Sequence, residues 1–400
     1  MKKFFFFCMM ALVTMCGLNS CSDDCDHEFI EYDYNKALVG TWTCFQEGYA
    51  EALVINADGS VLSTGVEDGE YWENIKGTIK TVNNKMTLIF EDDDNFEGRF
   101  EMLSGEAFTI YEENGESFTY RYCANDLSKE IVGMWVATTG PYMSVEVFNE
   151  DGSAIYTGFV PESEGMAVTS VTSYKVIGDL QFHTVAEGNS TYVVHRLIYS
   201  PSSQTSLGEI MTWQVDENIS FPRLRIKQHL ELPGMKYDYI KTFVNNVKGL
   251  DKDIEFMGTT FNFAKMDGVK LDKMLKTLLF TVEFPDANTI KYGCHYNNEP
   301  MSMEAPIVVD GNKMTVKMSE KNPALKDVDL YTFQDQDNTQ MHMYMHSTAF
   351  VNFFGNMQVT IMEQMGLLDT TDAAAVKAVF DSIDDAVETI NVSFVMTRAK

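Results

Sequence analysis

The chain has 400 residues and a formal net charge of −29, from 59 acidic and 30 basic side chains. A charge of this sign repels phosphate backbones and anionic headgroups, which argues against nucleic acid and lipid surfaces as direct partners. Seven cysteines are scattered singly without a C-x-x-C pair, so neither a zinc ribbon nor thioredoxin chemistry has support.

The chain begins on the plan of a secretory signal peptide. Two lysines precede an apolar run over residues 4–13, which is shorter than the roughly 20 residues of a membrane-spanning helix. Leu18-Asn19-Ser20-Cys21 then resembles a lipobox, in which the cysteine is acylated and becomes the mature N-terminus. We therefore expect a lipoprotein signal peptide over residues 1–20 and a lipid on Cys21. The alternative is an ordinary signal peptide, cut nearby, that leaves Cys21 a plain thiol.

Residues 21–35 are expected to form an acidic tether. Ser22-Asp23-Asp24-Cys25-Asp26 resembles the export signal that sends lipoproteins of Bacteroidota to the outer face of the outer membrane. A solvated tether without a sorting role would have the same composition. The expected location is the outer membrane, through the N-terminal lipid, with exposure on the cell surface and the periplasmic face as the alternative.

A comparison of the chain with itself indicates a repeated unit. Three motifs recur after 93 residues: Val39-Gly40-Thr41-Trp42 as Val132-Gly133-Met134-Trp135, Asp58-Gly59-Ser60 as Asp151-Gly152-Ser153, and Thr64-Gly65 as Thr157-Gly158. A fainter third copy is marked by Asn84-Lys85-Met86-Thr87, which recurs as Asn312-Lys313-Met314-Thr315. We expect units over residues 36–125, 126–230 and 254–400.

Each of the first two units contains about eight short runs of alternating apolar and polar residues, which is typical of antiparallel strands. Asp58-Gly59, Asn83-Asn84 and Asp151-Gly152 supply the turns that hairpins require. Eight such strands in succession close most naturally into a small up-and-down barrel, which leaves no exposed sheet edge.

The third unit also carries helical signals. Residues 350–366 and 372–388 lack strict alternation and are rich in helix formers, and residues 390–398 return to a strand pattern. We predict two helices inserted before the closing strand, with a further helical turn over residues 271–276. Residues 231–253 are predicted to form a helical linker that joins the second unit to the third.

Gly40-Thr41-Trp42 and Gly133-Met134-Trp135 resemble the G-x-W motif that opens the first strand of lipocalins. In that family the tryptophan plugs the closed end of the barrel, and an arginine of the last strand stacks across it. The resemblance implies that the barrel bases pair Trp42 with Arg121, and Trp135 with Arg225 or Arg223. It assigns Arg398 to the third unit, which has Thr260 in place of the tryptophan.

The mature chain as a whole resembles the lipocalin-like, calycin-type lipoproteins of unknown function found in Bacteroidota. This resemblance implies an all-β fold of three tandem lipocalin-like up-and-down β-barrels, the third with inserted helices. The units are shorter than true lipocalins, so the resemblance supports the architecture better than it supports carriage of a ligand.

Two cysteines lie on strands that barrel closure would make neighbours. Cys44 falls on the first strand of the first unit and Cys123 on its last. An oxidising compartment would allow a disulfide between them if their Cα atoms came within about 7 Å. The alternative is two separate thiols that behave as small hydrophobic side chains.

The segment His342-Met343-Tyr344-Met345-His346 places both imidazoles on one face of a strand and its methionines on the other. Two histidines about 7 Å apart along a strand cannot share one zinc ion without distortion. A polar face turned toward solvent is the favoured interpretation. His342 and His346 are nevertheless the first place to look for a transition metal or haem, although no cofactor is predicted.

No G-x-S-x-G, H-E-x-x-H, Walker A or G-x-G-x-x-G motif is present, and no catalytic residue is assigned. We expect a non-enzymatic binding module for a small molecule, a glycan or a partner protein of the envelope. The alternatives are a hydrolase that acts on extracellular carbohydrate or lipid, and a structural accessory subunit of a surface complex. An aromatic-lined barrel mouth with convergent polar groups would favour binding.

Overall fold

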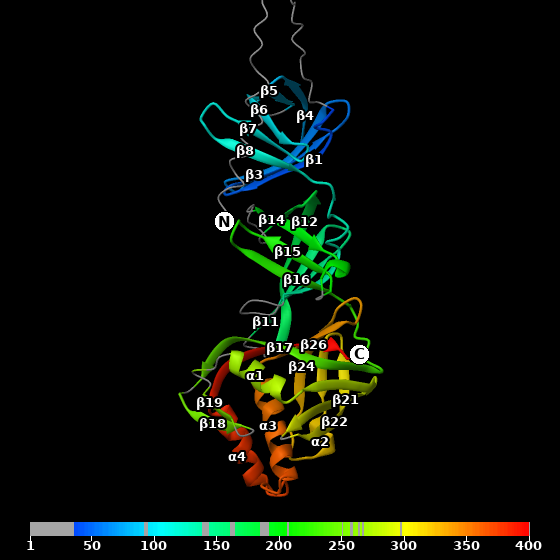
Figure 1. Cartoon of the computed structure of the whole chain (residues 1–400), viewed down its shortest axis with the longest axis vertical. Coiled ribbons are helices and arrows are strands. Elements are labelled where there is room, and N and C mark those ends of the chain that lie inside the picture. The colour runs from blue at the N-terminus through cyan, green and yellow to red at the C-terminus, as the bar shows by residue number, and fades with distance from the viewer. Residues whose placement is uncertain are drawn as a thin grey trace, which may run out of the picture.

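The computed structural model describes residues 36–399, with gaps at 92–94, 138–143, 161–164, 185–191, 206–207, 250, 257–258, 263–264, 266–267 and 297. The predicted signal peptide, Cys21 and the tether lie outside the described residues. Three closed eight-stranded antiparallel barrels follow one another along the chain and stack along the long axis of the molecule (Figure 1). The predicted fold class, three tandem β-barrels with helices in the third, is confirmed.

In the first barrel each strand pairs with the next, and the last returns to the first. Its strands are β1 Gly40–Gln46, β2 Tyr49–Ile55, β3 Ser60–Glu67, β4 Glu70–Val82, β5 Lys85–Phe90, β6 Phe96–Ser104, β7 Ala107–Tyr111 and β8 Ser117–Tyr122. Between β2 and β3, Asp58 Oδ1 accepts hydrogen bonds from the backbone and the hydroxyl of Ser60.

The second barrel repeats this arrangement, with β9 between β10 and β16. Its strands are β9 Gly133–Ala137, β10 Ser144–Phe148, β11 Ser153–Val160, β12 Gly165–Ile177, β13 Leu180–Thr184, β14 Tyr192–Ser200, β15 Ile210–Gln214 and β16 Ser220–Ile226, with a short 3-10 helix at Ser202–Gln204. Asp151 caps the turn at Ser153 as Asp58 does at Ser60, so the shared motif builds the same turn twice.

The third barrel opens with a strand where a helical linker was predicted. Its strands are β17 Met235–Gly249, β20 Thr281–Asp286, β21 Thr289–Tyr296, β22 Glu299–Asp310, β23 Lys313–Val316, β24 Val328–Gln334, β25 Gln340–Met345 and β26 Val387–Arg398. β17 pairs with β26 over most of its length, so the helix expected within 231–253 is wrong. The aromatic and β-branched residues of this segment favour a strand that is paired on both sides.

Insertions decorate the third barrel between its strands. They are the hairpin of β18 Asp253–Phe256 and β19 Thr259–Asn262, and the helices α1 Gly268–Thr277, α2 Met318–Lys321, α3 Ser347–Gln364 and α4 Ala373–Asp384. The helices predicted over 271–276, 350–366 and 372–388 are confirmed as α1, α3 and α4. The predicted start of the third unit at residue 254 is wrong, because the barrel already begins at β17 and residue 254 lies on β18 of the inserted hairpin.

A buried tryptophan lies at one end of each of the first two barrels. Trp42 and Trp135 are 0% exposed. The Nε1 atom of each donates to the carbonyl oxygen four residues earlier, at Leu38 and Ile131, over 2.7 Å in both cases. This bond joins the first strand to the segment that enters the barrel and satisfies the indole N–H within the apolar base.

Different residues cover the two indoles. The guanidinium carbon of Arg225 lies 4.8 Å from the ring centre of Trp135. In the first barrel the covering residue is Tyr122, whose ring centre lies 5.3 Å from that of Trp42. Arg121 is opposite Thr43 in the register and is exposed, so its expected stacking on Trp42 is wrong: side chains alternate along a strand, and Arg121 points outward.

The glycine of each G-x-W motif has a positive φ, and at Gly40 the covering ring also leaves no room for a side chain. Gly40 has a φ of +138°, and a side chain there would place its Cβ atom 2.5 Å from the ring of Tyr122. Gly133 has a φ of +137°. Both positions therefore disfavour any residue with a side chain.

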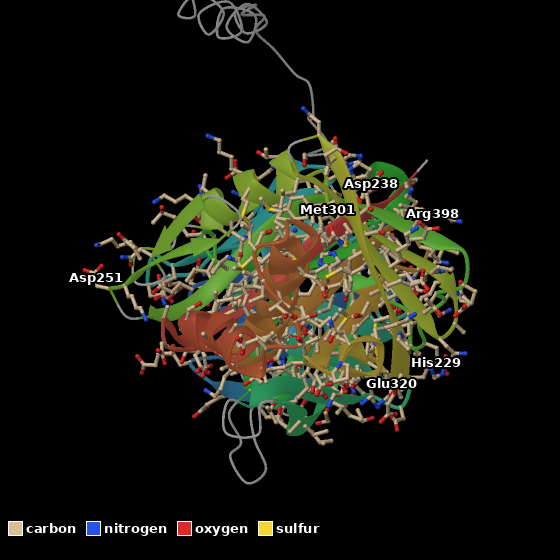
Figure 2. All side chains as sticks on the ribbon, turned by 90° about the horizontal axis from the view of Figure 1, so that it is seen from below. His229, Asp238, Asp251, Met301, Glu320 and Arg398 are labelled. Carbon is tan, nitrogen blue, oxygen red and sulfur yellow. The ribbon has the colours of Figure 1, made fainter. Side chains whose placement is uncertain are left out.

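The third barrel has a tyrosine where the others have tryptophan. Tyr237 is 0% exposed and pairs in register with Arg398, as Trp135 pairs with Arg225. Arg398 itself is exposed and lies at the edge of the view from below (Figure 2). The residue at this position of the third unit is thus Tyr237, and Thr260 lies in the inserted hairpin instead.

The barrels pack against one another through their outer walls. Between the first and second, the rings of Tyr71 and Tyr192 stack at 4.0 Å, and Lys175 Nζ lies 2.8 Å from Glu73 Oε1. Between the second and third, an apolar cluster joins Leu224 and Ile226 to Phe333 and Tyr344, among others. The faces that pack between barrels are thereby buried although they point away from the barrel interiors.

We predict that Trp42→Ala lowers the free energy of unfolding by about 3–5 kcal/mol, because it empties the base of the first barrel and leaves a cavity. Urea unfolding followed by fluorescence and circular dichroism measures the loss. Trp72→Ala is the matched control, since Trp72 lies half-exposed at the opposite end of the same barrel. Equal losses for the two variants would contradict a special role for Trp42.

Candidate functional site

The first barrel is hollow at the end opposite Trp42. The cavity has a volume of about 820 Å³ and opens among the β1–β2, β3–β4, β5–β6 and β7–β8 connections. Aromatic side chains supply much of its wall: Tyr49, Tyr71, Trp72, Phe90, Phe96 and Phe118. A concave site of this size with aromatic walls is typical of pockets that take small organic molecules.

A chain of hydrogen bonds converges on Glu51 in this cavity. Glu51 is only 5% exposed, and its Oε1 accepts from Ser63 Oγ over 2.5 Å. Its Oε2 accepts from the hydroxyl of Tyr49 over 2.6 Å and from that of Tyr120. Trp72 Nε1 donates to Ser63 Oγ over 2.7 Å. Four side chains from four strands thus orient one buried carboxylate.

The electrostatics of the cavity are acidic. Burial, and to a smaller extent the nearby Glu51, raise the pKa values of the Tyr49 and Tyr120 hydroxyls well above the usual value for tyrosine. Both hydroxyls therefore remain protonated donors. At the rim, burial and then Asp68 and Glu112 raise the pKa of Glu67. The rim therefore gathers carboxylates closely enough for them to repel one another.

A second hollow adjoins this mouth. A groove of about 940 Å³ runs between the first and second barrels and shares Tyr49 and Asp68 with the cavity. Its other walls combine Phe45 and Tyr192 with acidic side chains such as Glu217. The aromatic and acidic character of the mouth continues into the groove.

The interior of the second barrel is polar in a different way. Arg223 pairs with Glu146 over 3.0 Å, with 14% and 7% of the two side chains exposed. The rings of His183 and His195 lie 5.0 Å apart, and the Nδ1 atoms of both are buried without a partner among the described residues. Burial lowers the pKa of His183 to about 4 and that of His195 to about 3. Both imidazoles are therefore neutral at pH 7.

The third barrel is filled by its own helix. α3 lies at the centre of the view along this barrel, with strands around it (Figure 2). Phe350, Phe353 and Phe354 of α3 join the core that the strands form. The Met-lined crevice beside α3 has room of only about 20 Å³, on the scale of one water molecule.

His342 and His346 do not form a metal site. His342 is 4% exposed on the outer face of β25, and burial lowers its pKa to about 4. Met341, Met343 and Met345 point into the barrel core, so the predicted alternation is confirmed. The face expected to meet solvent is instead covered, because Tyr344 packs against the second barrel. His346 lies beyond the strand, at the start of α3, and no cluster of three or more metal-ligating side chains occurs in the described part of the chain.

The predicted disulfide is absent. Cys44 and Cys123 are both free. Cys44 is 1% exposed inside the barrel, where burial and then Glu51 raise its pKa to about 12. Cys123 lies past the end of β8, where its backbone N–H donates to Thr41 and its sulfur packs near Gly178 of the second barrel. The strand register therefore separates the two sulfur atoms.

Comparisons with other proteins add little to this geometry. No protein-family model matches the sequence, and neither does any curated protein. A double and a single mutant of the vaccine antigen transferrin binding protein B from Haemophilus parasuis Hp5 match at 11% identity and a TM-score of 0.24. The alignments cover 88% of this chain but only 66% of that protein, just under two thirds of its length. Similarity this weak does not establish a family.

A helix of the length and apolar character needed to cross a membrane is not found within the described residues.

Glu51 was not predicted as a site residue from the sequence. In Tyr49-Ala50-Glu51-Ala52-Leu53-Val54-Ile55 a glutamate reads as a solvent-facing position. Both faces of β2 are in fact covered, since Ala50 and Ala52 pack toward the second barrel. The apolar character of both faces was the available signal.

The neutral histidines predict that stability falls in acid. In the unfolded chain both histidines are protonated below pH 6.5. In the folded chain His183 is protonated only near pH 4 and His195 only near pH 3. The free energy of unfolding should therefore be unaffected above pH 6.5 and fall as the pH is lowered toward 4, by at most about 2 kcal/mol per histidine at pH 5.

Urea midpoints at pH 7.5, 6 and 5 measure this dependence. His195→Gln should flatten it, because glutamine stays neutral throughout the range while keeping polar atoms beside His183 and Arg223. His229→Gln is the control, since His229 is exposed. An identical pH profile in wild type and His195→Gln would contradict the assignment.

Proposed function

We propose that this chain is a lipid-anchored surface protein whose first barrel binds a small organic molecule without chemical conversion. The observation that carries the proposal is the open cavity of about 820 Å³, with aromatic walls and a carboxylate held by three hydroxyl donors. Such a combination of apolar wall and few oriented polar groups is what confers orientation and specificity on a ligand.

Binding fits this geometry better than hydrolysis does. A glycosidase needs two facing carboxyl groups, one of them free to give up or accept a proton. The oxygens of Glu51 are instead both occupied by hydroxyl donors, and the remaining acids of the cavity lie toward its rim. The other two barrels serve as support in this proposal: one has a salt-bridged polar interior and the other is filled by α3.

The anchor is tested by replacing its cysteine. We expect Cys21→Ala to abolish incorporation of labelled palmitate, because the proposed acylation has no other acceptor at the lipobox. Cys25→Ala is the matched control and should be labelled like wild type. Measurement is by metabolic labelling followed by electrophoresis. Label that persists in Cys21→Ala would overturn the anchor.

The binding site is tested by filling it. Ile75 lines the cavity, so Ile75→Trp should lower the affinity for small indole probes such as tryptamine and tryptophol by about tenfold or more. Ile89→Trp adds the same bulk to the outer surface, where Ile89 is 50% exposed, and should leave affinity unchanged. Isothermal titration calorimetry of the purified full chain measures both. Failure of tryptamine, tryptophol and the anionic indole-3-propionate all to bind wild type would overturn the proposed function.

A further inference from the structure

The charged groups of the cavity in the first barrel are all of one sign. Its ionisable wall and rim include Glu51, Glu67, Asp68, Glu70 and Glu112, and no lysine, arginine or histidine is among the described lining residues. The second barrel differs, because there the buried Glu146 is neutralised by Arg223. The first barrel supplies no such partner to Glu51 from its own walls.

A comparison of corresponding positions in the two barrels explains why Glu51 has no cationic partner. Tyr122 lies opposite Trp42 as Arg225 lies opposite Trp135. Two residues earlier on each closing strand, the second barrel has Arg223 and the first has Tyr120. The first barrel therefore places a neutral donor where the second places a cation, and no cationic side chain lies among the described residues that line its cavity.

The hydrogen-bond donors around Glu51 are already committed. The hydroxyl protons of Tyr49, Ser63 and Tyr120 are directed at Glu51, and the indole N–H of Trp72 is directed at Ser63. A hydroxyl has a single proton, so these groups offer only lone pairs to anything that enters. A ligand that meets this network has to bring the donors, and one that also brings a positive charge would neutralise Glu51.

The walls suit the same kind of ligand. The ring of Tyr49 lies 6.2 Å from that of Trp72 and 4.5 Å from that of Phe118, so aromatic faces and edges surround the space beside the carboxylate. An ammonium group is attracted to aromatic faces within about 6 Å, and more strongly when it is desolvated. The acidic rim would also steer a cation toward the mouth.

We propose that the first barrel is a receptor for organic ammonium ions, with the ammonium group at Glu51 and an apolar or aromatic body against the walls. This inference rests on the proposed function, since it names the ligand class of the same cavity. It follows from the sign of the charge, the direction of the hydrogen bonds and the aromatic lining together.

Three probes that share one indole and a two-carbon linker test the charge preference. Tryptamine is a cation, tryptophol is neutral and indole-3-propionate is an anion at pH 7. By calorimetry with the full chain, tryptamine should bind at least about tenfold more tightly than tryptophol, and indole-3-propionate should bind more weakly than tryptophol. Glu51→Gln should remove most of the advantage of tryptamine and leave tryptophol within about twofold. Glu106→Gln, an exposed site outside the cavity, should change neither.

The outcomes separate the two proposals. Equal binding of tryptamine and tryptophol by wild type would overturn the ammonium assignment and leave a small-molecule site. Binding of none of the three would overturn both. An equal loss in Glu106→Gln would show that only overall charge acts, which also overturns the assignment. Because the comparison of probes uses wild type, it decides the question even if Glu51→Gln does not fold.

Discussion

The hydrogen bond from a buried indole to the carbonyl four residues earlier is the interaction on which the first two barrels depend. It fixes the segment that enters each barrel to the first strand, and in the first barrel Gly40 makes room for Tyr122 of the last strand. One end is thereby sealed with apolar groups. In the first barrel, the hollow that holds Glu51 then opens at the other end.

The same architecture has three different interiors. The first retains a buried carboxylate without a cation, the second pairs Glu146 with Arg223, and the third is occupied by α3. Each barrel wall has eight strands, but the second interior contains the Arg223–Glu146 pair and the third contains side chains of α3. Among the described residues, the first of these three barrels holds the large open cavity.

The sequence predicted the barrels well and the site poorly. Turn motifs and G-x-W repeats located the first two units, because they record local backbone geometry. The prediction of the third unit was wrong at its first strand, because β17 has no G-x-W motif and a long insertion separates it from β20. The covering residue Tyr122 was missed in favour of Arg121, because strand register is set by pairing and not by local composition. Glu51 was missed because burial of both faces of β2 depends on the neighbouring barrel.

Strand β4 contributes both to the wall of the cavity and to the contact with the second barrel. Trp72 and Ile75 line the cavity, while Tyr71 stacks on Tyr192 and Glu73 pairs with Lys175 of the second barrel. A molecule that shifts β4 on entering the cavity therefore also changes the angle between the first two barrels. By thermodynamic reciprocity, whatever holds that angle in place alters affinity for the molecule by the same factor. Strand β4 thereby links occupancy of the cavity to the angle between the first two barrels.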